Sequence, residues 1–232
     1  MNSWWIYPLC AYILVCAIAT GAFYVNEKRV WACIFKLAAS VGFMLIGILS
    51  AFSNPDDLRY SAIVLSGLVF CTAGDVMLML KELFEEKFAI RFMLGGVLFF
   101  GAAQVLFSAA MIADVGKFNF WLLPFLLIVP LGMLLFHRMH VVTLDRYGVV
   151  MIIYGVLISM SFLSALNGFI ALRSDFYIAM LFALAFFMIS DSALLYTYYG
   201  SDVNLKRMLN YVVMVFYYIA MILISFSVTL KA

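Results

Sequence analysis

Apolar stretches of membrane-spanning length, separated by short polar breaks, decide what this chain can fold into. A helix that crosses a bilayer needs roughly 20 mostly apolar residues. Cutting the sequence at its polar breaks leaves eight such stretches, and lipid offers their backbone groups no water to bond, so each has to be helical. We expect spanning helices at residues 5–25, 30–52, 61–80, 92–112, 120–136, 149–172, 176–197 and 208–229.

The connections between these stretches are all short, so helices adjacent in the sequence should pack as antiparallel neighbours. We therefore predict an all-α integral membrane protein, a single bundle of about eight transmembrane helices in which residues 1–232 form one domain. The composition agrees, since 11% of the residues are charged, against roughly a quarter in soluble domains. A net charge of +2 without a basic run argues against nucleic acid as a partner. The sequence leaves the oligomeric state open.

Basic residues are divided unevenly between the two sides of the predicted bundle. The first, third, fifth and seventh connections carry nine of them, and the opposite side carries four. The nine are Lys28, Arg29, Lys81, Lys87, Arg91, Arg138, Arg146, Lys206 and Arg207, and the four are Arg59, Lys117, Arg173 and Lys231. The positive-inside rule then places both termini outside the cytoplasm. Short loops and this bias suit a bacterial inner (cell) membrane, and a eukaryotic internal membrane stays open as the alternative.

Three ionisable side chains lie well inside the predicted spans: Lys36, Asp75 and Asp191. Charged groups at such positions are costly, and by default they mark a functional site that faces the bundle interior. Each lies five or six residues from the cytoplasmic end of its span, hence about 8–9 Å deep at the rise of an α-helix. Three helices therefore present ionisable groups at one level.

Tyrosines lie near the same depth, at Tyr154, Tyr217 and Tyr218. Together with the three ionisable residues they predict a polar chamber that opens toward the cytoplasmic leaflet. Two simpler interpretations stay open. The tyrosines could belong to an interfacial belt or to the core, and the long side chain of Lys36 could reach the headgroups by snorkelling.

The two aspartates have a structural and a functional interpretation. Asp75 could pair with Lys36 and so fix two helices against each other. A second aspartate, Asp191, then has no second intramembrane cation. Two carboxylates that share one basic partner titrate as a coupled set, and such a set suits acid and base roles. We therefore favour function for the pair.

Other chemistries have weaker support in the sequence. His137 and His140 form HRMH, which lacks the HExxH pattern of zinc ligands. Ser190 and Ser192 flank Asp191, but no GxSxG elbow accompanies them. We expect no metal, no cofactor and no serine hydrolase.

Five blocks of the sequence resemble the YhhN family of membrane lysoplasmalogenases. The strongest are GLVFCTAGDVMLML (67–80), GGVLFFGAAQVLF (95–107) and FALAFFMISDSALL (182–195). Two flanking blocks agree, IFKLAASVGFMLIG (34–47) and FYYIAMILISFS (216–227). The similarity runs in order from about residue 30 to 228. Departures from the family pattern are Leu37 for Pro, Gln104 for His, Phe107 for Tyr and Met221 for Gln.

The resemblance implies an enzyme, an ether hydrolase that cleaves the vinyl ether bond of lysoplasmalogens to a fatty aldehyde and a glycerophospho-alcohol. The acidic pair of the family corresponds to Asp75 and Asp191, which would act as general acid and as stabiliser of the cationic intermediate, with the order undecided. The expected partners are a lysophospholipid substrate and membrane lipid. Residues expected to bind the substrate are Lys36, Gln104, Tyr154, Tyr217 and Tyr218.

Two other functions stay open at this point. Paired intramembrane carboxylates also serve proton-coupled carriers, so a small transporter or a lipid-binding membrane protein is the main alternative. Transporters tend to contain internal repeats, and no repeat at a fixed offset is visible here. The second alternative is a catalytically altered family member, which the loss of a histidine at Gln104 would suit.

Overall fold

Residues 4–54, 57–142 and 147–231 are described by the computed structural model. In this part of the chain, eight helices are long and apolar enough to cross a membrane, which confirms the predicted all-α bundle. Seven of them are α1 (Ile6–Val25), α2 (Arg29–Ser53), α3 (Leu58–Leu83), α4 (Glu86–Val115), α6 (Gly148–Leu172), α7 (Asp175–Tyr199) and α8 (Val203–Leu230). The fifth in order is formed by the 3-10 helix η2 (Phe120–Leu127) and α5 (Ile128–Arg138) together.

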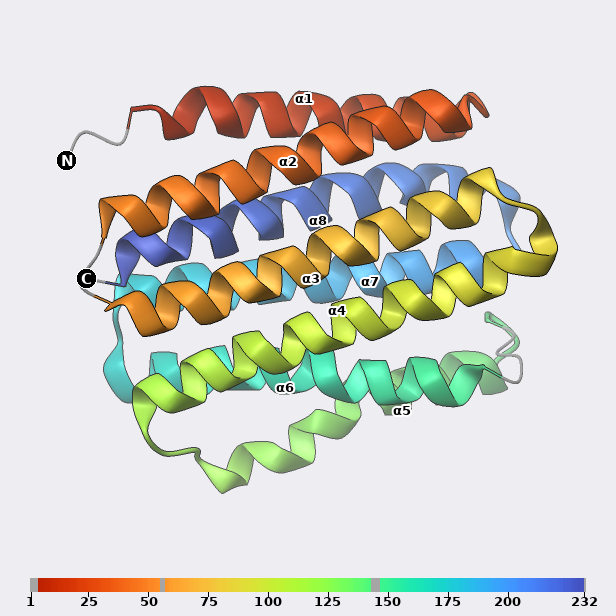
Figure 1. Ribbon diagram of the computed structural model, residues 1–232. Helices are drawn as coiled ribbons and strands as arrows, with labels where there is room; N and C mark the ends of the chain where they lie inside the picture. Colours follow the sequence, from red (N-terminus) through yellow and green to blue (C-terminus); the bar gives the residue numbers. More distant parts are fainter. Residues whose placement is uncertain (1–3, 55–56, 143–146, 232) are drawn as a thin grey trace.

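The helices run back and forth along one common direction (Figure 1). Both ends of the chain lie at one end of the bundle, and the connections that carry most of the basic residues lie at the other. Arg146, one of the nine basic residues counted above, lies outside the described residues. The layout thus matches the predicted segregation of charge.

Two helices, α3 and α8, begin before the predicted spans and are capped there by side chains. The Asp57 carboxylate accepts a hydrogen bond from the backbone N–H of Tyr60 at 3.0 Å, which starts α3. Asp202 accepts one from Asn204 at 2.8 Å, which starts α8. The helices α3 and α8 therefore begin within the polar breaks of the sequence, before the apolar stretches that the sequence predicts as spans.

The fifth span is only partly α-helical, unlike the prediction. Its first half is the 3-10 helix η2, which contains Pro124, and only its second half is α-helical. Proline has no N–H to donate and disturbs α-helical bonding. The span packs mainly on α6 and exposes large apolar side chains such as Ile128, Leu131 and Leu135. In Figure 1, η2 diverges from the rest of the bundle.

Helix α8 is central to the packing, since it contacts α1, α2, α3 and α7. Its residues Met221 and Ile224 are fully buried. Helices α3 and α4 approach closely beside Asp75, because Gly74 leaves room for a ring: a Cβ at this position would lie 2.9 Å from Cε2 of Phe100. Asp75 is thus buried in the closely packed interior of the bundle.

A second polar cluster ties the helices together at the end of the bundle that holds the termini. Lys231, after α8, forms an ion pair with Asp114 of α4, and Tyr177 of α7 donates a hydrogen bond to the same carboxylate. Asn54 donates to the backbone oxygen of Val228 at 3.1 Å. This cluster was not predicted, because Asp114 lies outside the expected span 92–112.

Candidate active site

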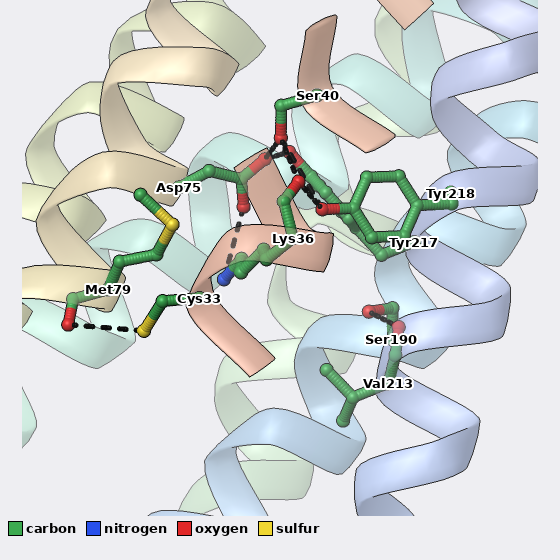
Figure 2. A network of polar contacts seen from close by, with 9 residues as sticks. All are labelled: Cys33, Lys36, Ser40, Asp75, Met79, Ser190, Val213, Tyr217 and Tyr218. Carbon is green, nitrogen blue, oxygen red and sulfur yellow. Dashed lines mark hydrogen bonds and ion pairs between the residues drawn. The ribbon is translucent and has the colours of Figure 1, made fainter. Parts of the chain in front are cut away.

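Lys36 and Asp75 form a buried ion pair between α2 and α3. Nζ of Lys36 lies 3.2 Å from Oδ1 of Asp75 (Figure 2). The two residues are 4% and 1% exposed. The ammonium group therefore stays inside the bundle, and the alternative that Lys36 snorkels to the headgroups is wrong.

Two hydroxyl groups complete the surroundings of Asp75. Ser40 donates to Oδ2 at 2.7 Å, and Tyr217 of α8 donates to the same oxygen at 2.8 Å (Figure 2). Three donors on one carboxylate match the hydrogen bonding of an anion. Sequence reasoning missed Ser40, although it lies one helical turn after Lys36 and therefore on the same face of α2.

Tyr218 contacts the backbone of Lys36 and forms no hydrogen bond with the ammonium or the carboxylate of the ion pair. Its hydroxyl donates to the backbone oxygen of Lys36 at 2.9 Å and lies 3.4 Å from Oγ of Ser40. The side chain is fully buried in the core. Tyr218 thus holds α8 against α2 and lies behind the wall of the chamber that the sequence predicts.

Asp191 of α7 has a different environment from Asp75. Its Oδ2 accepts a hydrogen bond from the hydroxyl of Tyr154 on α6. Among the described residues, no lysine or arginine lies within ion-pair distance of this carboxyl group. The neighbouring Ser190 donates to the backbone oxygen of Val213 at 3.0 Å and so fixes α7 to α8 (Figure 2). Asp191 itself is half-buried and turned toward open space.

Gln104 lies between α4 and α6, deep in the bundle. Its Oε1 accepts a hydrogen bond from Ser161, and its side chain is fully buried. Within the described part of the chain, its Nε2 has no hydrogen-bond partner. The structure therefore places Gln104 between two helices and away from the cavity walls.

A polar cavity of about 390 Å³ joins the predicted site residues. Lys36, Asp75, Asp191 and Tyr217 line it. The sequence prediction that Lys36, Asp75 and Asp191 share one chamber is thereby confirmed. Charged residues from the ends of the helices line it too, namely Glu27, Arg29, Lys81, Glu82 and Lys206.

A second cavity, of about 300 Å³, is lined mainly by apolar side chains of α5, α6 and α7. Its walls include Val129 and Met133 from α5 and Ile158 from α6. Both cavities share a short boundary formed by Leu78, Phe100, Asp191, Leu194 and Tyr198. Tyr154 lines the apolar cavity. Asp191 is therefore the one carboxylate that a molecule occupying both cavities would meet at their junction.

The groups on these walls are suited to moving protons. The predicted site residues among them supply the carboxyl groups of Asp75 and Asp191, the buried ammonium of Lys36 and the phenols of Tyr154 and Tyr217. Among the described residues, no group of three or more His, Cys, Asp or Glu side chains is arranged to hold a metal ion. The chemistry available to these side chains is general acid and base catalysis with electrostatic stabilisation of charge.

Comparison with known proteins identifies one family. A family model described as the YhhN family matches residues 31–228, which is most of the chain. The matched range contains both aspartates, Lys36 and the three site tyrosines. No curated protein and no solved structure matches the chain. The resemblance found in the sequence blocks is thus confirmed.

Proposed function

The chain belongs to the YhhN family, and we propose that it hydrolyses the vinyl ether bond of lysoplasmalogens to a fatty aldehyde and a glycerophospho-alcohol. The observation that supports this most is that a polar and an apolar cavity meet at Asp191. A lysoplasmalogen has a polar headgroup and one apolar chain, and its vinyl ether bond lies where they join. Seated with each part in the matching cavity, it would present that bond to Asp191.

The reaction consumes one water molecule and needs acid first. A proton added to the β-carbon of the vinyl ether leaves an oxocarbenium ion at the adjacent carbon. Water adds to that carbon and gives a hemiacetal. The hemiacetal then breaks its bond to the glycerol oxygen. That oxygen gains a proton and leaves as a free hydroxyl group, while the hemiacetal hydroxyl loses its proton and becomes the carbonyl group of the aldehyde.

Asp191 is our candidate for the acid. Tyr154 occupies its Oδ2, and none of the described residues is hydrogen-bonded to Oδ1, which can carry the proton toward the substrate. No lysine or arginine that the structure describes lies within ion-pair distance of Asp191, so no ion pair has to break for this group to carry a proton. Once the proton has moved to the β-carbon, the resulting carboxylate takes a proton from the attacking water and is restored.

Asp75 is our candidate for the anion that stabilises the oxocarbenium ion. Lys36, Ser40 and Tyr217 hold it in place, and a fixed charge that needs no rearrangement during the reaction is the most effective kind. In this scheme Lys36 orients Asp75. The hydroxyls of Tyr154 and Tyr217 line the two cavities and can orient the glycerol.

Gln104 and Tyr218 take positioning roles in the same scheme. Gln104 fixes α4 to the helix that carries Tyr154, through its bond with Ser161. Tyr218 fixes the backbone of Lys36. The charge distribution supports a further part of the proposal, that the mouth of the polar cavity faces the cytoplasm of a bacterial inner membrane with both termini outside.

The test is aldehyde release by the detergent-purified protein from lysoplasmenylethanolamine, with an ester-linked lysophospholipid as the control substrate. We expect release from the vinyl ether lipid alone, and its loss in Asp75→Asn and Asp191→Asn. Asp114→Asn is the matched control, because it makes the same change at the other end of the bundle and should keep full activity. A folded wild type that releases no aldehyde would refute the proposal.

A further inference from the structure

We propose that Arg29, Lys81 and Lys206 bind the phosphate group of the lysophospholipid at the mouth of the polar cavity. This inference rests on the proposed function and names the part of the site that recognises the headgroup. The three side chains come from α2, α3 and α8, and all three line the cavity that contains both aspartates. Basic side chains with several N–H donors are the usual protein ligands of phosphate.

Lys36 is not free for this role. Its ammonium lies 3.2 Å from Asp75, and its side chain is almost fully buried. Removing it from that partner would leave a buried carboxylate without a cation, which is costly. The cations that remain available in the cavity are those at the mouth.

The side chain of Lys81 is held at the cavity wall. Its Nζ lies 3.7 Å from the ring centroid of Tyr198 and 3.2 Å from Oε1 of Glu82. An ammonium group has three donors, and Glu82 accepts from one of them, so others are free for phosphate oxygens. Arg29 donates to the backbone oxygen of the same Glu82 at 3.5 Å. Both cations therefore contact Glu82 at the mouth of the cavity.

The spacing along the helices fits the length of the substrate. Lys81 follows Asp75 by six residues, which is about 9 Å along an α-helix. Tyr198, under the Lys81 ammonium, follows Asp191 by seven residues, or about 10 Å. In a lysoplasmalogen about seven bonds separate the β-carbon of the vinyl ether from phosphorus, roughly 8 Å when extended. A phosphate at the mouth would therefore place the reacting carbon at the level of the aspartates.

The experiment compares a lysoplasmenylethanolamine with an alkenylglycerol that lacks the phosphate. For the phosphate-bearing lipid, we expect Lys81→Gln and Lys206→Gln each to raise KM about 10-fold and to leave kcat nearly unchanged. For the alkenylglycerol, neither substitution should change KM. Lys81→Arg keeps the charge and should restore most of the affinity. Arg207→Gln is the matched control, since it removes an exposed charge beside Lys206.

The outcomes separate this inference from the proposed function. Equal changes in KM for both substrates, or none for either, would overturn the phosphate site while leaving the hydrolysis in place. A wild type that releases aldehyde from neither substrate refutes the hydrolysis. The phosphate site is then tested by ligand binding alone. An ester-linked lysophospholipid should raise the melting temperature of the wild type more than a monoacylglycerol does, and Lys81→Gln should abolish that preference. A preference that survives in Lys81→Gln would also overturn the site.

Discussion

Asp75 and Asp191 are the same residue type at the same depth, yet their surroundings differ. Asp75 is enclosed by α2, α3 and α8 and accepts bonds from an ammonium and two hydroxyls. Asp191 faces two cavities and accepts a bond from one phenol. Three donors hold the carboxyl group of Asp75 in one position, whereas Asp191 accepts from one phenol and faces the cavities. The two proposed roles rest on this difference.

The helices around the two aspartates also differ in how closely they pack. The α2, α3 and α8 side belongs to the main apolar core. The chamber beside Asp191 is closed by α5, which packs mainly on α6 and exposes its other face. A well-packed wall holds a charge in place, and a thinly covered one leaves room for a lipid chain. The side of the site at Asp75 is therefore closely packed, whereas the side at Asp191 is packed loosely.

The largest expected effect is a difference in stability between the two aspartate variants. Asp75→Asn leaves the Lys36 ammonium buried without a counterion, which should cost about 3–5 kcal/mol. Asp191→Asn removes no ion pair and should cost less than about 1 kcal/mol. Thermal melting in detergent measures both. Replacing the pair together, Lys36→Met with Asp75→Leu, should recover most of the stability without activity. Equal losses in the two single variants would contradict the comparison.

A middle-sized effect is expected on the open side of the site, at Gly132 of α5. No heavy atom of the described residues lies within 4 Å of a Cβ built there, and the residue lines the apolar cavity. Gly132→Phe should therefore fill the cavity and raise KM for long-chain substrates about 10-fold, or roughly 1.4 kcal/mol. Short-chain substrates should be spared. Leu131→Phe, on the exposed face of the same helix, is the control, and an equal effect there would sink the idea.

The smallest expected effect concerns the link between α4 and α6. Ser161→Ala removes the donor to the buried Gln104 oxygen, which should cost about 1 kcal/mol of stability. Adding Gln104→Met removes the unpaired amide and should restore the melting temperature. A single variant that melts like the wild type would show that this bond contributes nothing, and with it the positioning role of Gln104 would fail.

The spans and the depth of the ionisable groups can be predicted from the sequence. A helix needs a minimum length to cross the bilayer, and a charged side chain inside it costs free energy and is therefore rare. Counting residues from the polar breaks placed Lys36, Asp75 and Asp191 together, and one cavity does contain all three. For Lys36 the sequence allowed two interpretations, pairing with Asp75 or snorkelling to the headgroups. The structure shows the pairing, because the rotation of α2 against α3 brings the two side chains together.

Other features depend on contacts that residue counting does not reveal. Tyr154 donates to Asp191 because α6 and α7 pack side by side with those faces together, and no spacing predicts that pairing. Pro124 indicates a break in α-helical bonding in the fifth span. We did not predict the 3-10 helix, because the span is apolar throughout and was therefore expected to be one α-helix. Arg29, Lys81 and Lys206 entered the sequence analysis only as evidence of orientation, since their convergence on one cavity requires three helices to be placed.

The central claim is that the reaction starts with a proton moved from Asp191 to the β-carbon, and isotope labelling tests it most directly. Hydrolysis of lysoplasmenylethanolamine in heavy water, with the aldehyde trapped at once and analysed by mass spectrometry, reports where the new hydrogen goes. The account predicts one deuterium on the carbon next to the carbonyl group, and no aldehyde from Asp191→Asn. Aldehyde without deuterium, or labelled aldehyde formed by Asp191→Asn at the wild-type rate, would contradict it.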